Sequence, residues 1–281
     1  MFMNIAIIPN ISKDMGLITT TRLVEVIGGR ANIIMDSMYD IGQFKAEFTD
    51  RDIFEKCDTA IVLGGDGTIL QVAGECAKRD IPILGINLGR IGFMSEVEQE
   101  DIENAVDKLL SGEYTIESRM MLKSDIIRDG LLQGTFHALN DVVISKAADV
   151  KLISTAIYCG EEKISEYICD GLIISTPTGS TGYNLSAGGP VIKPDMKLLA
   201  ATPICAHMLS AKPMIIPDNP PITIKLSDKV SANSAIVVSD GDNIGYIKSG
   251  DEIIISRSEY ETKLIKMGNS SFYDIFIRKL S

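Results

Sequence analysis

The sequence predicts an α/β N-terminal domain with a parallel sheet, followed by an all-β, sandwich-like C-terminal domain. In roughly the first hundred residues, continuous apolar runs alternate with stretches of helical spacing, which is typical of a parallel sheet covered on both faces. From about residue 115 onward, short β-branched segments follow one another between turn residues, as in sandwiches. Ser271–Leu280 regains helical spacing, and we expect this helix to return to the N-terminal domain.

The α/β domain is predicted from four buried strands and two helices. Each strand is a short apolar run, and the third leads directly into Gly64-Gly65. The helices repeat apolar residues at the three- and four-residue spacing of one helix face. In chain order the expected strands are Asn4–Pro9, Ile33–Met35, Thr59–Leu63 and Ile81–Ile86, and the expected helices are Ile69–Lys78 and Asp101–Leu110.

The all-β domain is predicted from segments separated by turn pairs such as Asp129-Gly130, Cys159-Gly160 and Asp240-Gly241. The expected strands are Met121–Arg128, His137–Ser145, Ser154–Cys159, Leu172–Ser175, Pro213–Ile216, Pro221–Leu226, Ala235–Ser239 and Glu252–Ile255. We therefore expect an α/β domain over 1–115, an all-β domain over 116–265, and a tail over 266–281 that packs on the α/β domain.

The composition excludes several classes of partner. A net charge of −11 and a pI of about 4.7 argue against nucleic acid or an anionic membrane, since both need a positive field. No signal-type segment opens the sequence, and no apolar run approaches the ~18 residues of a membrane span. Five cysteines without a CxxC pair indicate reduced thiols and a cytoplasmic protein, and two histidines are too few for a His-rich metal site.

The first segment that carries chemistry is Gly64-Gly65-Asp66-Gly67-Thr68, between a predicted strand and a predicted helix. Glycines let the backbone approach a phosphate, and the helix N-terminus after them presents free N–H donors. A bare carboxylate would repel a phosphate. Asp66 is explained if it accepts a hydrogen bond from an attacking hydroxyl, or if it holds a metal ion. The alternative is a tight turn in which Asp66 only caps the helix.

The second segment runs from Asp170-Gly171 to Pro190 and is dense in glycine and hydroxyl residues. Such a segment suits close binding of phosphates and sugar hydroxyls. Because the chain is acidic, a polyphosphate must be met by backbone donors, by a few Lys or Arg, or by a metal ion. Taken alone, Thr176–Gly182 is equally explained as a turn between strands, and Tyr183 as a half-buried packing residue.

With these segments in place, the sequence resembles the NAD kinase family. Gly-Gly-Asp-Gly-Thr is shared with diacylglycerol and sphingosine kinases, so the other segments decide. Asn87–Met94 looks like the family's Asn-x-Gly-x-x-Gly-Phe-Leu segment, and Asn140-Asp141 stands where the family has Asn-Glu. Asp170–Pro190 matches its longest signature nearly residue for residue. Further similar segments, in the family's order, are Pro203–Pro213, Ser239–Gly241 and Ser271–Leu280.

The resemblance implies transfer of a phosphoryl group from ATP, or from polyphosphate, to the 2′-hydroxyl of the adenosine ribose of NAD. It makes Asp66 the proton acceptor, places Gly67 against the dinucleotide, assigns Asn140 and Asp141 to adenine and ribose, and assigns Asp170 to the nicotinamide end. The other NAD-binding residues that it implies are Lys151, Thr181, Gly182, Tyr183, Asn184, Leu185, Ser186 and Asp242, and the phosphate loop would comprise Gly64, Gly65 and Thr68.

The resemblance also implies a divalent metal ion, Mg²⁺, as part of a metal–nucleotide complex, and a homodimer or homotetramer formed through the β domain. Two departures bear on binding: Asp141 is one methylene shorter than the commoner Glu, and Asp242 cannot donate as the frequent Gln does. A lipid kinase of the same superfamily and a dinucleotide sensor without turnover are the alternatives. The acidic charge and the second segment disfavour the former, and Asp66 disfavours the latter.

Overall fold

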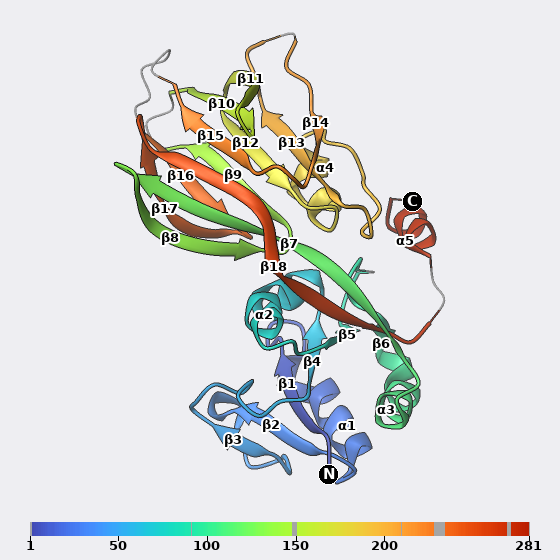
Figure 1. Ribbon diagram of the computed structural model, residues 1–281. Helices are drawn as coiled ribbons and strands as arrows, with labels where there is room; N and C mark the ends of the chain where they lie inside the picture. Colours follow the sequence, from blue (N-terminus) through green and yellow to red (C-terminus); the bar gives the residue numbers. More distant parts are fainter. Residues whose placement is uncertain are drawn as a thin grey trace. The chain divides into compact units, whose positions relative to one another are not determined.

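The computed structural model describes residues 2–90, 92–147, 151–208, 210–227, 234–268 and 271–280. The chain divides into two compact units: unit 1 is Met1–Ser118 with Thr262–Ser281, and unit 2 is Arg119–Glu261. Two long strands, β7 (Thr115–Arg128) and β18 (Glu252–Lys266), continue along the chain from one unit into the other (Figure 1). The division expected from the sequence, with domain limits at 115 and 265, remains a prediction.

Unit 1 is built on a parallel sheet with the strand order β5-β4-β1-β2-β3. A short strand, β6, and the last part of β18 pair with β5. Every residue of β4 and β5 is buried, which explains why both are continuous apolar runs in the sequence. The strands are β1 (Asn4–Pro9), β2 (Asn32–Asp36), β3 (Glu47–Thr49), β4 (Thr59–Gly64), β5 (Ile83–Asn87) and β6 (Val97–Glu98).

Helices cover both faces of this sheet. On one face, α1 (Ile18–Ile27) and α3 (Ile102–Ser111) share a core with the strands, including Ile5 and Leu63. On the other face lies α2 (Asp66–Lys78): a Cβ added at Gly85 of β5 would stand 2.7 Å from the Ile69 side chain of that helix. Single 3₁₀ turns precede α1 and α3 and follow β2, at Met15–Leu17, Gln99–Asp101 and Ser37–Tyr39.

Unit 2 is an antiparallel sandwich. One sheet has the order β14-β13-β12-β9-β16-β17, and the other runs β11-β10-β15-β18 and continues through β7 to β8. Apolar residues of both sheets form one core, among them Val142 and Leu172 from the first and Ile224 and Ile253 from the second. The remaining strands are β8 (Leu131–Ala138), β9 (Asp141–Lys146), β10 (Ile153–Cys159), β11 (Glu162–Cys169), β12 (Gly171–Ser175), β13 (Leu198–Ile204), β14 (Met214–Pro217), β15 (Ile222–Leu226), β16 (Ser234–Ser239) and β17 (Asp242–Lys248).

The α/β domain followed by an all-β sandwich confirms the predicted fold class, and several elements differ in detail. The single strand expected over His137–Ser145 is wrong: β8 ends at Ala138 and β9 begins at Asp141. The chain breaks there because the amides of the intervening residues donate to the Asp240 side chain. The helix expected from Ile69 begins three residues earlier, at Asp66. Elements that the sequence analysis did not anticipate include α1, β11, β13 and β17.

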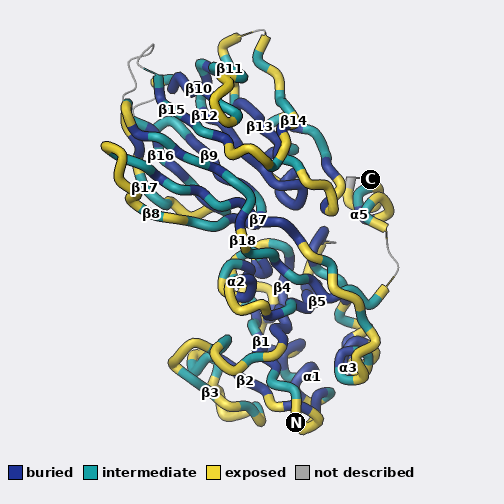
Figure 2. Tube along the Cα trace, in the orientation of Figure 1, coloured by how far each residue is buried: buried dark blue, intermediate teal, exposed yellow. Residues whose placement is uncertain are grey.

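The predicted C-terminal helix is present as α5 (Phe272–Leu280) and belongs to unit 1. The ring centroid of Phe272 lies 5.9 Å from that of Phe93, in the loop after β5. Figure 2 shows how unevenly the unit is buried: β4 and β5 are covered, whereas much of α5 is exposed. Within the described ranges, no helix combines the length and apolar character needed to cross a membrane.

Candidate active site

Three loops meet at the carboxyl edge of the unit 1 sheet, where parallel strands end together. They follow β1, β4 and β5, and hydrogen bonds tie them to one another. The Asn10 amide donates to the Leu63 carbonyl at 2.9 Å, and the Leu88 amide donates to the Gly64 carbonyl at 2.7 Å. The Asn10 side chain donates to Thr68 Oγ1 at 2.8 Å. The predicted phosphate loop is therefore cross-linked to both of its neighbours at the edge where open α/β sheets bind ligands.

Asp66 is the first residue of α2, and its carboxylate is held by backbone amides. The amides of Phe93 and Met94 donate to its two oxygens at 2.8 and 3.0 Å. A Cβ at Gly92 would collide with the carboxylate, so this close approach requires glycine. The side chain is still 26% exposed, which leaves it within reach of a ligand. Asp66 does not cap α2: Gly65 is the N-cap residue, and the Asp66 oxygens accept from Phe93 and Met94 rather than from the amides of the helix.

The glycines before Asp66 bring a lysine against the backbone. A Cβ at Gly64 would collide with the side chain of Thr68. A Cβ at Gly65 would lie 2.8 Å from Lys13 Nζ, and one at Gly89 would lie 3.9 Å from the same atom. The exposed ammonium of Lys13 thus sits beside the start of α2, where the helix dipole and first-turn amides favour an anion.

A second polar cluster lies in unit 2, at the sheet edge where β9 begins and where β12 and β16 end. The Asp240 carboxylate accepts hydrogen bonds from the amides of Leu139, Asn140 and Asp141 at 2.6, 2.8 and 3.0 Å. Asp240 and Gly241, with φ of 49° and 95°, form the tight turn between β16 and β17, a conformation that Asp-Gly pairs favour. One side chain therefore fixes the backbone of both predicted recognition residues.

Asp141 is a buried acid with a strongly shifted titration. Its side chain is 7% exposed, and its carboxylate has no hydrogen-bond partner among the residues that the structure describes. Burial, reinforced by the negative charge of Asp240, raises the pKa of Asp141 to about 7. Burial also raises the pKa of Asp240, although the three backbone amides oppose that shift. Near neutral pH, Asp141 can therefore either donate or accept a hydrogen bond.

The hydroxyl-rich segment after β12 folds onto the backbone of Asn140. The amide of Thr176 donates to the Asn140 carbonyl at 2.9 Å, and Thr176 Oγ1 donates to the Leu139 carbonyl at 2.6 Å. A Cβ at Gly179 would collide with the Asn140 carbonyl, so this packing requires glycine. A 3₁₀ turn (Gly179–Thr181) and the short helix α4 (Tyr183–Ser186) follow.

Some of the predicted NAD-binding residues of this segment are exposed, and others are buried. Asn184 is fully buried; its amide donates to the carbonyls of Ser180 and Pro190, and its oxygen accepts from Thr202 Oγ1. Asn184 thus holds the segment together. Tyr183 is 49% exposed, and Ser186 is also exposed, so both are open to a ligand. Of the other predicted residues, Gly182 is exposed and Thr181 and Leu185 are partly exposed.

The remaining predicted NAD-binding residues of unit 2 lie at opposite ends of the strands. Asp242 opens β17 opposite Ser239 and lies at the same edge as Asn140. Asp170 precedes β12 and therefore lies at the other end of that strand, roughly 17 Å away for five residues. There it pairs with Lys146 at 2.7 Å. Lys151 is exposed and stands two residues before Ile153, which pairs with Cys169 next to Asp170.

The sequence analysis missed the roles of Lys13, Asp240 and Lys279. Lys279 Nζ, on α5, lies 3.4 Å from Asp66 Oδ2. Lys13 follows the first strand closely, and the rule that parallel strands end at one edge could have pointed to it. The Asp240-Gly241 pair signals a turn but not the target of its carboxylate. No local signal links Lys279 to Asp66. Within the described ranges, no cluster of three or more metal-ligating side chains is present.

Comparison with known proteins gives one consistent result. Residues 11–114 match the model of the ATP-NAD kinase N-terminal domain, and residues 139–267 match that of the ATP-NAD kinase C-terminal domain. The NAD kinase of Natranaerobius thermophilus is 38% identical over 99% of this chain and 98% of its own length. The NAD kinase of Carboxydothermus hydrogenoformans is 42% identical over 80% of both chains.

Solved structures agree at the level of the fold. A yeast NADH kinase complexed with NADH superposes with a TM-score of 0.86 at 24% identity, covering 99% of this chain and 86% of that one. An NAD kinase from Archaeoglobus fulgidus in complex with ATP gives a TM-score of 0.73 at 26% identity, with 99% and 98% covered.

Fold and site together define a two-domain kinase in which a glycine-rich turn presents one carboxylate at the edge of a parallel sheet. The chain belongs to the ATP-NAD kinase family, since both domain models and full-length relatives match it. This membership supports phosphorylation of NAD and does not favour the lipid-kinase alternative.

Proposed function

We propose that this protein transfers the terminal phosphoryl group of ATP to the 2′-hydroxyl of the adenosine ribose of NAD, with Asp66 as the proton acceptor. The observation that carries the proposal is the Asp66 carboxylate, fixed by two backbone amides and still open to solvent beside the predicted phosphate loop. A carboxylate there would hinder simple phosphate binding, whereas an attacking hydroxyl needs an acceptor.

The reaction does not require Asp66 to be a strong base. Phosphoryl transfer passes through a loose transition state, so the hydroxyl proton need not leave early. The two amides occupy part of the lone-pair capacity of the carboxylate and set its plane, which leaves lone pairs for the ribose hydroxyl. Asp66 would therefore orient the nucleophile and accept its proton as the bond to phosphorus forms. Positioning is the larger part of the rate acceleration.

The phosphates would be met by the glycine loop rather than by a basic surface. Gly64, Gly65 and Thr68 shape the loop, and Gly67 is exposed in the first turn of α2. Lys13 adds one positive charge beside Gly65. Mg²⁺ enters as part of the nucleotide substrate, because Mg²⁺ binds mainly through phosphate oxygens and waters. The described residues offer no three-ligand cluster for a resident ion, so no step is assigned to a protein-held metal.

The dinucleotide would be recognised by the Asn140 edge of unit 2. Asn140 and Asp141 are held by Asp240, and their side chains have no partner in the described part of the chain. An amide and a half-protonated carboxyl can match both donors and acceptors on adenine and ribose. Further contacts are proposed for Thr181, Gly182, Tyr183, Leu185, Ser186 and Asp242, with Asn184 acting through its buried bonds to neighbouring backbone.

Asp170 is a proposed contact of the nicotinamide end, although it lies at the opposite sheet edge from Asn140 within one chain. Lys151, near Asp170, is proposed as a further NAD contact. A homodimer or homotetramer formed through the β domain would let a second copy present that edge, and we propose such an assembly. A cytoplasmic location is proposed because all five cysteines are free thiols.

A coupled assay tests this function. Purified protein is incubated with NAD, Mg²⁺ and ATP, and NADP is read with an NADP-specific dehydrogenase. NADP formation is expected. Product with polyphosphate but not with ATP would change the donor and keep the acceptor. Bound NAD with no product from either donor would contradict the proposal and favour the sensor without turnover.

A further inference from the structure

We call Lys266–Gly268 together with α5 the C-terminal segment of unit 1. Its first residues are bonded to Glu96, which lies just after Phe93 and Met94, the two amide donors to Asp66. Glu96 has a side chain 7% exposed and accepts from the amides of Met267 and Gly268 at 3.1 and 2.9 Å. It also forms a short ion pair with Lys266. Because Glu96 lies two residues after Met94, this attachment is made to the same stretch of chain that holds Asp66.

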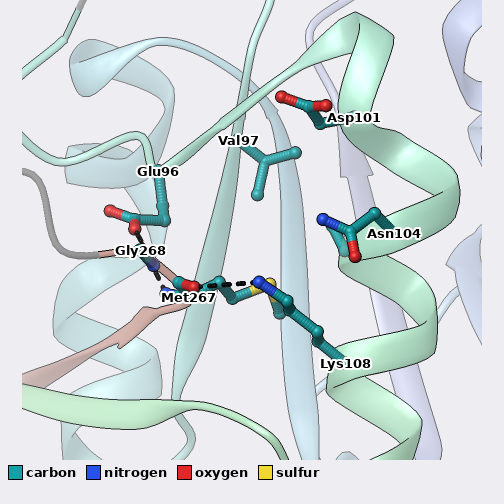
Figure 3. Close-up of a pocket in the computed structure, with 8 residues that line it drawn as sticks. Glu96, Val97, Asp101, Asn104, Lys108, Met267 and Gly268 are labelled. Carbon is teal, nitrogen blue, oxygen red and sulfur yellow. Dashed lines mark hydrogen bonds between the residues drawn. The ribbon is translucent and has the colours of Figure 1, made fainter.

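Figure 3 shows this attachment from the side of a pocket of about 200 Å³. Lys108 of α3 reaches across to the Met267 carbonyl, with an Nζ–O distance of 3.2 Å, opposite Glu96. In this wall Glu96 and Lys108 are both paired with the chain at Met267, and these bonds anchor the strand end in unit 1.

The far end of the C-terminal segment reaches Asp66 itself. Phe272 packs on Phe93 at 5.9 Å and stacks on Phe276, and Ile275 of the same helix is buried. Two turns along, Lys279 Nζ lies 4.3 Å from the centre of the Phe93 ring and 3.4 Å from Asp66 Oδ2. One lysine therefore contacts both the carboxylate and the residue whose amide holds it.

We infer that Lys279 is a positioning residue for Asp66, delivered by the docking of α5 on Phe93. This inference rests on the proposed function of Asp66 as proton acceptor. A carboxylate beside a transferring phosphoryl group repels it, and the Lys279 cation offsets that charge from 3.4 Å at Oδ2, the oxygen that also accepts from the Phe93 amide, while Oδ1 accepts from the Met94 amide. The cation–π contact with Phe93 restrains the ammonium, so its effect does not depend on a freely moving side chain.

Arg278 provides a matched control. It stands next to Lys279 on α5, is exposed, and its guanidinium donates to the Asp274 carbonyl of its own helix. Lys279→Met and Arg278→Met each remove one positive charge from the same turn, but only the former removes a contact with Asp66. Lys279→Arg keeps a cation that can reach both the carboxylate and the ring.

Four kinetic results are expected in the coupled NADP assay. Lys279→Met lowers kcat by about 10-fold or more and leaves KM for NAD within about twofold, because the contact acts on the transition state. Lys279→Arg recovers most of the turnover, and Arg278→Met stays within about twofold of wild type. In an Asp66→Asn background, Lys279→Met causes no further loss, since the lysine acts through that carboxylate.

Hydrogen exchange separates this inference from the proposed function. The amides of Phe93 and Met94 bond to Asp66, so a peptide covering them is expected to exchange faster in Lys279→Met than in Arg278→Met. This readout stands even if wild type forms no NADP. Equal exchange in the two variants, equal loss of turnover with and without the Asp66 carboxylate, or higher turnover in Lys279→Met would each overturn the inference.

Discussion

The two polar edges of this protein hold their functional groups by opposite means. At the unit 1 edge, backbone amides and a lysine surround a partly exposed carboxylate, Asp66. At the unit 2 edge, the half-buried Asp240 carboxylate accepts hydrogen bonds from three backbone amides, and the Asn140 and Asp141 side chains make no hydrogen bond within the described residues. In the first case the backbone positions a side chain, and in the second a side chain positions the backbone.

The difference matches the separate tasks proposed for the two edges, reaction at unit 1 and recognition at unit 2. The group proposed to react must stay accessible and precisely oriented, and the amides of Phe93 and Met94, in the loop between β5 and β6, hold it in place. The surface proposed to recognise a ligand needs a fixed backbone and free side chains, so its organiser, Asp240, bonds to the backbone. Changes at unit 1 should therefore reduce turnover, whereas changes at unit 2 should reduce stability or affinity.

The largest effect is expected for Asp66→Asn. We expect kcat to fall by about 10²–10⁴-fold with little change in NAD affinity, because the proposed proton acceptor is lost. The amide would also turn an N–H₂ group toward the amide of Phe93 or Met94. The assay is therefore paired with NAD binding by calorimetry and with thermal unfolding. Near-normal turnover would remove Asp66 from the mechanism.

Asp240→Ala should show the opposite signature. Three backbone amides at a largely buried edge would lose their acceptor, and we expect a loss of about 3 kcal/mol or more in the free energy of unfolding. Urea unfolding measures this loss. KM for NAD should rise more than kcat falls. A variant with unchanged stability and a pure kcat defect would break the distinction drawn between the two edges.

Two neighbours in α4 sharpen the comparison inside unit 2. Asn184→Ala should cost about 2 kcal/mol of stability, since it removes three buried hydrogen bonds. Tyr183→Ala should leave stability within about 1 kcal/mol and raise KM for NAD by about 10-fold, because its exposed ring is the proposed contact with NAD. Urea unfolding measures the stability of both variants, and the coupled assay measures their KM for NAD. Equal changes in both quantities for the two variants would contradict a structural role for Asn184 and a binding role for Tyr183.

The pH dependence of stability isolates Asp141. Its pKa of about 7 in the folded state lies above the unfolded value, so the folded protein binds more protons between about pH 4 and pH 7. The free energy of unfolding therefore falls as pH rises through this window and levels above it. Relative to Asp141→Asn, wild type should lose on the order of 2 kcal/mol between about pH 5 and pH 8. An equal difference in the free energy of unfolding between wild type and Asp141→Asn at the two pH values, measured by urea unfolding, would refute this.

The smallest effect is expected for Asp242→Gln, which replaces a carboxylate that only accepts hydrogen bonds with an amide that also donates. Asp242 is exposed at the start of β17, so stability should change by less than about 0.5 kcal/mol. An amide that can donate is expected to lower KM for NAD by no more than about threefold. A larger change in affinity would make this exposed position a principal contact of the recognition edge.

Much of the fold follows from local patterns. Buried strands such as β4 appear as unbroken apolar runs, and α3 repeats Ile102, Ala105 and Leu109 on one face. Glycine positions in the phosphate turn follow from close backbone approach. The split between β8 and β9 could not be predicted locally, because Asp240, about a hundred residues away, supplies the hydrogen bonds that interrupt the strand.

The sequence by itself determined the order of elements, the glycine turn with its single carboxylate, and the family, because each depends on neighbouring residues and spacing. Only the tertiary structure decided which side chains meet. It brought Lys279 to Asp66, set Asp240 beneath Asn140, and separated Asp170 from that edge. The physical reason is that strand pairing and helix docking join distant segments, and no local spacing encodes which charges those pairings bring together.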